Sequence, residues 1–374
     1  MMNCELRQLN TFIKSCSTSN AAIKNTASPI PKEGWYPAYS ASGQDVWLPE
    51  YRYSGKGIVV SAVGARCGKC FQADGKWNVT ANTHVLLVDE SIADYKYCWY
   101  LLNNENWWIK SGSGQPFVKV KDSLNRSILL PDLSTQQNIA TILDKISEGI
   151  ALCRKMLGEL DLMVKAKFGE MFGDAHNNSA FPYKNIGDLT TVTSGGTPDR
   201  ENNLYWDDGN IRWVKTTELQ NCTICDTEEK ITKLGLENSS AKLVPAGSVL
   251  IAMYGQGKTR GMTAYLENES ATNQACACIL PSSKINQKYL WKYLMLSYDK
   301  LRSMAKGGNQ PNLNIGIIKN FPVLYPPIEL QNQYVEFVIY IDKSILTIKG
   351  ILAKMEEMKL ALMQKCFKEG KHGE

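Results

Sequence analysis

The stretch AMYGQGKT, residues 252–259, has the residue types and spacing of a phosphate-binding loop. A small residue and four others precede Gly257, Lys258 and Thr259, and in such a loop backbone N–H groups and a lysine hold phosphates. The loop must also open a helix, whose N-terminal amides face the phosphates. Here the next residues, RGMTAYLENES, alternate like a strand and end in a polar turn. The stretch therefore predicts strand, glycine turn and strand. The alternative interpretation is that the chain is a nucleotide-dependent enzyme that uses residues 252–259.

Other residues capable of catalysis or metal binding are few and scattered. Only three histidines are present, His84, His176 and His372, and the last two lie in a linker and at the tail, so we expect no His-based triad or metal cage. The chain has two CxxC pairs, Cys67/Cys70 and Cys222/Cys225. They do not fall at equivalent positions of the two halves of the chain, so a zinc site shared between them is disfavoured. We expect neither a catalytic nor a metal site in this chain.

Length and composition favour a protein with more than one core. A chain of 374 residues exceeds one ordinary domain, and 44% apolar residues can fill real cores. No run of 18 apolar residues and no secretory signal is visible, and eleven scattered cysteines fit reduced thiols, so we expect a cytoplasmic protein without membrane spans. The net charge of +5 is modest and compatible with a polyanionic partner.

The strongest feature is an internal repeat. Residues 111–137 align without a gap on residues 306–332, with Gln115-Pro116 on Gln310-Pro311 and Gln136 on Gln331. Further upstream, GIVVSAVGARCGKC (57–70) aligns with SVLIAMYGQGKTRG, and TANTHVLLVDES (80–91) with TNQACACILPSS (272–283). The first-half copy of AMYGQGKT reads SAVGARCG and lacks the Lys-Thr pair, which argues against a phosphate loop.

Each half ends in a long apolar heptad pattern, with steps that alternate between four and three as in a coiled coil. The seam residues of the first half are Ile139, Leu143, Ile146, Ile150, Cys153, Leu157, Leu160 and Val164. Adding 195 gives Tyr334, Val338, Ile341, Ile345, Ile348, Leu352, Met355 and Lys359, where the lysine is the one break. The pattern predicts two helices of about 55 Å that pack on each other in antiparallel fashion, rather than two separate core helices.

The two lobes before these helices predict mixed strands, turns and short helices without a βαβ rhythm. YLWKYLMLSYDKLRSMA (289–305) predicts one amphipathic helix, with YKYCWYLLNNENWWIKS (95–111) as its partner. Polar residues of the lobe turns could read base edges, because Arg and Lys donate to guanine and Asn and Gln pair with adenine. The candidates are Tyr39, Ser40, Ser42, Arg66, Lys69 and Gln115 in the first lobe, and Thr197, Lys215, Thr216, Thr217, Tyr254, Gln256, Lys258, Arg260 and Gln310 in the second.

The chain resembles the DNA-specificity (S) subunit of type I restriction-modification enzymes. The resemblance rests on TSGGTP followed by YWDDGNIRWVKTTEL, on YPAYSASG with YRYSGKGIVVSAVG, and on GGNQPNLN with FPVLYPPIELQNQ and its weaker twin SGQPFVKV with ILLPDLSTQQN. It covers nearly the whole chain. The first lobe departs from the pattern, since CSTSN (16–20) stands where GGTP would be and Ser134 replaces the acidic Glu329.

This resemblance implies an α/β fold with two pseudo-repeated target-recognition domains joined by two antiparallel coiled-coil spacer helices. The expected bounds are 1–133 and 179–328 for the recognition domains, and 134–174 and 329–370 for the helices. The family plan implies a non-catalytic subunit whose lobes each read half of an asymmetric, bipartite site in double-stranded DNA. The expected partners are two methyltransferase subunits, which use S-adenosylmethionine, and translocase/endonuclease subunits, which use ATP and Mg. A purely structural coiled-coil adaptor is a third reading.

Overall fold

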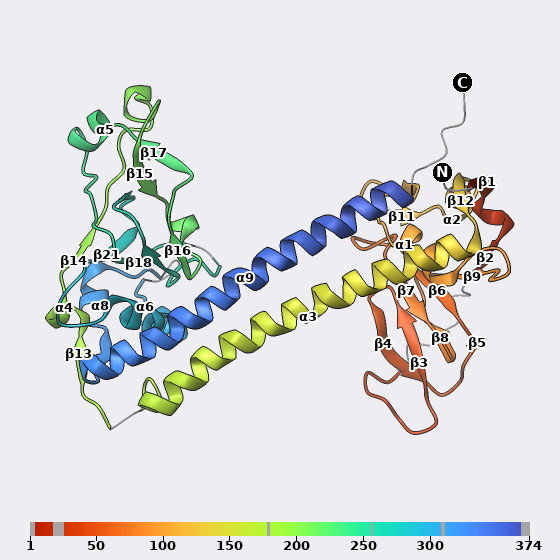
Figure 1. Ribbon diagram of the computed structural model, residues 1–374, viewed down its shortest axis with the longest axis horizontal. Helices are drawn as coiled ribbons and strands as arrows, with labels where there is room; N and C mark the ends of the chain where they lie inside the picture. The colour runs from red at the N-terminus through yellow and green to blue at the C-terminus, as the bar shows by residue number, and fades with distance from the viewer. Residues whose placement is uncertain (1–3, 18–25, 178–179, 256, 308–310, 368–374) are drawn as a thin grey trace. The chain divides into compact units, whose positions relative to one another are not determined.

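The computed structural model describes residues 4–17, 26–177, 180–255, 257–307 and 311–367. The chain divides into two compact units, each a mixed helix and sheet lobe with segments of the two long helices (Figure 1). Unit 1 contains Met1–Lys155 and Lys349–Glu374, and unit 2 contains Met156–Ile348. The expected fold class, paired α/β lobes with long connecting helices, is confirmed.

The lobe of unit 1 holds two four-stranded sheets. The first has the order β2-β9-β6-β7 and is antiparallel throughout; its strands are β2 (Ile13–Ser17), β9 (Thr83–Val88), β6 (Gly57–Ser61) and β7 (Cys70–Ala73). The second has the order β4-β3-β8-β5, with β4 (Gly43–Leu48), β3 (Tyr36–Ser40), β8 (Lys76–Val79) and β5 (Tyr53–Ser54). Helix α1 (Tyr95–Leu102) is largely buried, and a ribbon of β1 (Cys4–Gln8) and β12 (Ser127–Pro131) leads into the long helix α3.

The lobe of unit 2 repeats this plan. A five-stranded sheet has the order β14-β21-β18-β19-β16, with β14 (Val192–Ser194), β21 (Cys276–Ile279), β18 (Val249–Ala252), β19 (Thr263–Leu266) and β16 (Cys222–Ile224). A three-stranded sheet joins β17 (Glu229–Ile231), β15 (Ile211–Val214) and β20 (Ala271–Thr272). Strands β13 (Tyr183–Asn185) and β22 (Pro322–Leu324) form the ribbon that leads into the long helix α9. The order β2-β9-β6-β7 thus matches β14-β21-β18-β19, so the sequence repeat is a repeat of topology.

Two equivalent glutamines show how closely the repeat extends to side chains. Gln136 is fully buried; its Oε1 accepts from the backbone N of Asp94 at 2.8 Å, and its Nε2 donates to Pro131 O at 2.7 Å. Gln331, also fully buried, accepts from Asn286 N at 2.9 Å and donates to Pro326 O at 2.8 Å. In both units a buried amide therefore joins the start of the lobe helix to the start of the long helix.

The amphipathic segment of the second lobe is not one helix. It forms α6 (Gln287–Leu296) and α7 (Tyr298–Ser303), which meet at Ser297. The Ser297 hydroxyl donates to Tyr293 O at 2.8 Å, a local bond of the kind that bends helices. The partner segment in the first lobe ends its helix α1 at Leu102.

The stretch AMYGQGKT leads into a strand, as the alternation predicts. Strands β18 and β19 pair antiparallel on either side of the turn, and no helix N-terminus follows Thr259. Gly255, with φ of +135°, and Gly257, with φ of +60°, take backbone conformations that favour glycine. The nucleotide-enzyme alternative therefore has no structural support.

The long helices are α3 (Leu133–Phe172) and α9 (Ile328–Cys366). All the predicted seam residues are buried or half-buried. Within unit 1, the early part of α3 around Leu143 packs with Leu362 and Met363 of α9, and Arg154 Nη2 lies 2.7 Å from Glu356 Oε1. Within unit 2, the late part of α3 packs with the early part of α9 through Val164, Phe168, Tyr334 and Val338. The helices are antiparallel in both units, and the coiled-coil geometry itself stays a prediction.

The start of α3 has its own cap. The Asp132 carboxylate accepts from the Ser134 hydroxyl at 2.6 Å and from the backbone N of Thr135 at 2.9 Å, and these bonds lower the pKa of Asp132 to about 2. Ser134 corresponds to Glu329 of the second half. Its hydroxyl donates to Asp132, so the acidic residue at the start of α3 is Asp132, two residues earlier than the position of Glu329 would indicate.

Within the described ranges, no helix is long and apolar enough to cross a bilayer.

Candidate nucleic-acid interface

In each lobe, four chain segments meet beside the sheets. They are the end of a strand, which is β3 in unit 1 and β15 in unit 2; the connector from the sheet of that strand to the sheet that contains β9 or β21; the glycine turn of this second sheet; and a loop containing Gln-Pro. Most of the predicted base-reading residues lie on these segments. The contacts between the four segments correspond in unit 1 and unit 2.

In unit 1 the connector is residues 80–82. The backbone N of Thr80 donates to Tyr39 O at 2.9 Å, which ties the connector to the end of β3. The N of Ala62 donates to Asn82 O at 2.9 Å, which ties it to the glycine turn, and the N of Gly64 donates to Pro116 O at 2.8 Å. The segments that carry Tyr39, Arg66, Lys69 and Gln115 are thereby bonded into one cluster.

In unit 2 the connector is residues 273–275. The N of Asn273 donates to Val214 O at 3.1 Å, beside Lys215, and the N of Met253 donates to Ala275 O at 2.8 Å, beside Tyr254. The N of Leu313 donates to Met253 O at 3.0 Å, as the N of Val118 donates to Ala62 O at 2.9 Å in unit 1. These bonds make Thr80 equivalent to Asn273. The sequence alignment of 80–91 with 272–283 pairs Thr80 with Thr272 instead, so the two alignments differ by one residue.

The GGTP motif packs against the connector of unit 2. A Cβ on Gly195 would overlap the backbone of Thr272, and a Cβ on Gly196 would overlap Ser240. The N of Gly196 donates to Thr272 O at 2.9 Å, and Trp213 Nε1 donates to Gly196 O at 3.0 Å. The two glycines are therefore required by close approach, and they bring the Thr197 hydroxyl to the Gln274 side chain, whose Oε1 accepts from it.

Arg260 does not project from the glycine turn as predicted. Its Nη1 donates to Pro311 O, which ties the turn to the Gln-Pro loop. Arg302 of α7 supports the same turn, donating to Arg260 O at 2.6 Å and to Gly257 O at 2.8 Å, and Tyr298 OH donates to Lys258 O at 2.7 Å. The side chain of Lys258 itself is exposed, so the turn presents this cation on a fixed backbone.

Lys215 is engaged by carboxylates. Its Nζ lies 2.8 Å from Glu228 Oε2 and 2.9 Å from Glu229 Oε1, and these two hydrogen bonds raise the pKa of Lys215. Glu229 also pairs with Arg200, whose guanidinium lies 3.8 Å from the ring centroid of Trp206. Lys215 therefore positions β17 beside the 3₁₀ turn Thr216–Glu218, on which Thr217 is exposed.

Three predicted residues of the first lobe are bound within their own sheet. The ring of Tyr39 packs edge-on against Trp77 at 5.9 Å, and burial raises the pKa of its hydroxyl. Ser40 Oγ donates to Asp45 at 2.7 Å and accepts from the backbone N of Ser42 at 3.0 Å. Tyr39 contributes its backbone carbonyl to the cluster, while the two serines order the β3–β4 hairpin.

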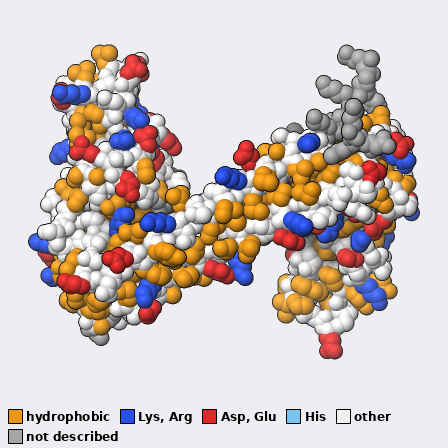
Figure 2. Space-filling view, in the orientation of Figure 1, with side chains coloured by type: hydrophobic (Ala, Val, Ile, Leu, Met, Phe, Trp, Pro, Cys, Tyr) orange, Lys and Arg blue, Asp and Glu red, His pale blue; other side chains and the backbone are white. Residues whose placement is uncertain are grey.

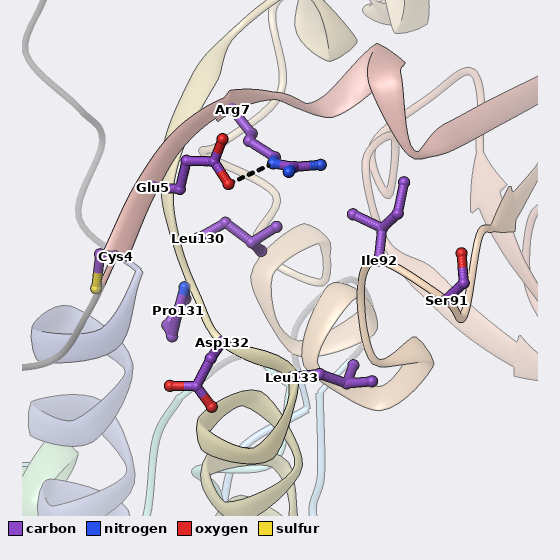
Figure 3. Close-up of a pocket in the computed structure, with 9 residues that line it drawn as sticks. All are labelled: Cys4, Glu5, Arg7, Ser91, Ile92, Leu130, Pro131, Asp132 and Leu133. Carbon is purple, nitrogen blue, oxygen red and sulfur yellow. Dashed lines mark hydrogen bonds and ion pairs between the residues drawn. The ribbon is translucent and has the colours of Figure 1, made fainter.

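A hollow of unit 1 lies away from these segments. It has a volume of about 590 Å³ and lies beside the β1–β12 ribbon and the start of α3 (Figure 3). Arg7 and Glu5 pair across 2.9 Å in its wall, and none of the predicted base-reading residues lines it. Among the described residues, no group of three His, Cys, Asp or Glu side chains is placed to hold a metal ion.

The model of the type I restriction modification DNA specificity domain matches residues 11–161 and again residues 178–357. The chain belongs to this family. The two matches divide the specificity-domain chain as its internal repeat does, with one copy over each lobe and much of the helix that follows.

Relatives of this specificity-domain chain carry consistent names. It is 24% identical over 309 residues to the EcoR124I/EcoR124II specificity subunit of Escherichia coli, covering 78% of this chain and 74% of that protein. It is 24% identical over 322 residues to the MjaVIII specificity subunit of Methanocaldococcus jannaschii, covering 80% and 75%. The crystal structure of the S subunit from M. genitalium has the same fold, with a TM-score of 0.69 at 15% identity over 99% of this chain and 97% of that one.

The predicted residues of the specificity-domain chain differ in how exposed their side chains are. Exposed side chains on the clustered segments are Arg66, Gln115, Thr217, Tyr254 and Lys258, and Lys69 and Thr216 are half-buried there. Gln256 and Gln310 lie outside the described residues. Sequence reasoning missed Gln274, which is exposed on the connector; the TNQAC stretch aligned with TANTH was the available signal.

Proposed function

We propose that each lobe of this chain reads one half of an asymmetric, bipartite site in double-stranded DNA, and that the chain itself performs no catalysis. The observation that carries the proposal is the pair of corresponding four-segment clusters, which share three backbone hydrogen bonds but carry different side chains. Base-edge contacts from such clusters would choose the sequence, while exposed cations such as Arg66 and Lys258 would contact phosphates. Because the two clusters share a scaffold but carry different side chains, we expect the two half-sites to differ in base sequence.

The long helices support docking of partner subunits. Apolar side chains gather over α3 and α9 (Figure 2), and several are exposed, among them Leu152 at 57% and Leu360 at 59% in unit 1 and Leu162 at 62% and Leu346 at 73% in unit 2. Exposed apolar stretches of this kind mark interaction surfaces. The partners are two methyltransferase subunits, which would bring S-adenosylmethionine and modify adenine, and translocase/endonuclease subunits, which would bring ATP and Mg. The helices would also set the gap between the half-sites.

The test is single-molecule sequencing of DNA from cells with and without this chain. The proposal predicts a methylated motif of two different half-sites separated by a fixed gap, and this methylation disappears when the chain is deleted. A methylation pattern that does not change on deletion, or a motif without two parts, contradicts it. Mapping also distinguishes DNA reading from a purely structural adaptor, since an adaptor has no motif of its own.

A further inference from the structure

We infer that Gln274 is a specificity-determining residue of the second lobe, and that its partner Thr197 makes it prefer guanine to adenine. The inference rests on the proposed DNA-reading function, and it names the residue pair and the base that one position of the site selects. Three features carry it: a rigid backbone under Gln274, an exposed amide, and a side-chain oxygen that already has a donor.

The backbone on both sides of Gln274 is held by three different segments. Thr272 O accepts from Gly196 N at 2.9 Å, Asn273 N donates to Val214 O at 3.1 Å, and Ala275 O accepts from Met253 N at 2.8 Å. Gln274 itself is exposed at the centre of this frame. A side chain held on such a frame meets a ligand in a fixed orientation, which base discrimination requires.

The hydrogen bond from Thr197 fixes the orientation of the Gln274 amide. Because Oε1 accepts from the Thr197 hydroxyl, one of its two lone pairs is occupied, while both N–H donors of Nε2 remain available to a ligand. Gln reads adenine with both groups together, since adenine offers a donor at N6 and an acceptor at N7. With one lone pair of its oxygen occupied and its amide oriented by Thr197, Gln274 is a better donor than acceptor toward a ligand, and two donors match the guanine edge, which offers acceptors at N7 and O6.

The first lobe has a different residue at this place. The connector bonds that align Thr80 with Asn273 align Ala81 with Gln274, and Ala81 is exposed. A methyl group offers no hydrogen bond to a base edge. The same position of the scaffold is therefore polar and donor-bearing in one lobe and apolar in the other, so it contributes to the difference between the half-sites.

The experiment maps methylated motifs in cells that carry the full complex with the wild-type chain, Gln274→Ala, Thr197→Val or Thr197→Ser. We expect Gln274→Ala to relax one position of one half-site, where the wild type requires guanine. Thr197→Val removes the hydroxyl and frees Oε1, so adenine becomes acceptable at that position, with a change in the guanine-to-adenine preference of about 5- to 150-fold. Thr197→Ser keeps the hydroxyl and keeps the wild-type motif.

The purified complexes provide a second measurement, in case a variant loses methylation altogether. Their affinities are compared on duplexes that carry each of the four bases at every position of the wild-type motif. The inference is overturned if Gln274→Ala has the same base preferences as the wild type. It is also overturned if the wild type prefers adenine at the position that Gln274→Ala relaxes, or if Thr197→Val leaves the preference for guanine unchanged. Absence of any bipartite motif with the wild-type chain instead overturns the proposed function itself.

Discussion

The ring of Phe367 packs against the ring of Tyr97 in unit 1, with the centroids 5.0 Å apart. The residue 195 positions before Phe367 is Phe172, and in unit 2 its ring packs against Tyr289 at 5.4 Å. Tyr289 lies three residues after the helix cap Asn286, as Tyr97 lies three residues after the helix cap Asp94. Each lobe core is thus completed by the last turns of a long helix that begins after the other lobe. The sequence repeat therefore includes the helix ends, and the lobes depend on them for stability.

Phe172→Ala should destabilise unit 2 by about 3–5 kcal/mol, because the side chain is 1% exposed and its removal leaves a cavity. Hydrogen exchange measured by mass spectrometry localises the effect, with faster exchange expected in peptides of unit 2 and little change in unit 1. Leu162→Ala on the same helix is the control, since Leu162 is 62% exposed. Equal exchange in unit 2 for the two variants would show that the ring contact does not support the core.

Gly195→Ala should displace the connector that carries Gln274, because the added Cβ overlaps Thr272. Binding of the assembled complex to its DNA site should fall, and discrimination between bases should be lost in one half-site only. Gly158→Ala is a matched control, since Gly158 is in α3 and a Cβ there meets nothing; it should stabilise the chain by about 0.5–1 kcal/mol. Unchanged binding by Gly195→Ala would mean that this close approach does not position the reading cluster.

Lys258→Ala should weaken binding about equally for all DNA sequences, because the contact proposed for this exposed cation is with phosphate, which carries no sequence information. The slope of log K against log salt concentration should decrease by about 1. Arg260→Ala provides the comparison: Arg260 joins the turn to Pro311 O, so its loss should alter the order of the turn as well as the charge. A loss of affinity that depends on sequence would identify Lys258 as a base reader.

Lys359→Met should remove a pH-dependent part of the stability. Burial, together with the charge of Arg154, lowers the pKa of Lys359 in the folded chain below its ordinary value of 10.5. Between the two values the unfolded chain binds more protons, so the contribution of Lys359 to stability rises as pH increases toward 10.5. Unfolding free energies measured across this alkaline range should show that rise in the wild type and a smaller one in Lys359→Met. Parallel pH curves would contradict the assignment.

The sequence predicted the elements whose signals are periodic or repeated. The heptad seams gave α3 and α9, the alternation after AMYGQGKT gave β19, and the shifts of 191 to 195 residues gave the corresponding strands. These features are local in sequence, or appear twice, and burial then follows from apolar periodicity.

The candidate site was only partly predictable, because side-chain partners come from segments distant in sequence. Lys215 meets Glu228 and Glu229 through the pairing of β15 with β17, and Arg260 meets Pro311 across 51 residues. Both looked like free cations in the sequence. Gln274 had no distinguishing feature in a short polar connector until its contact with Thr197 was known.

The most direct measurement of two separate reading lobes compares methylated motifs for Gln274→Ala and Ala81→Gln in the full complex. Ala81 and Gln274 occupy corresponding positions of the two connectors, so each substitution alters one lobe alone. We predict that Gln274→Ala changes one half of the bipartite motif and Ala81→Gln changes only the other half, with the gap unchanged in both. If both substitutions change the same half-site, or neither changes any base, the lobes do not read separate halves of the DNA.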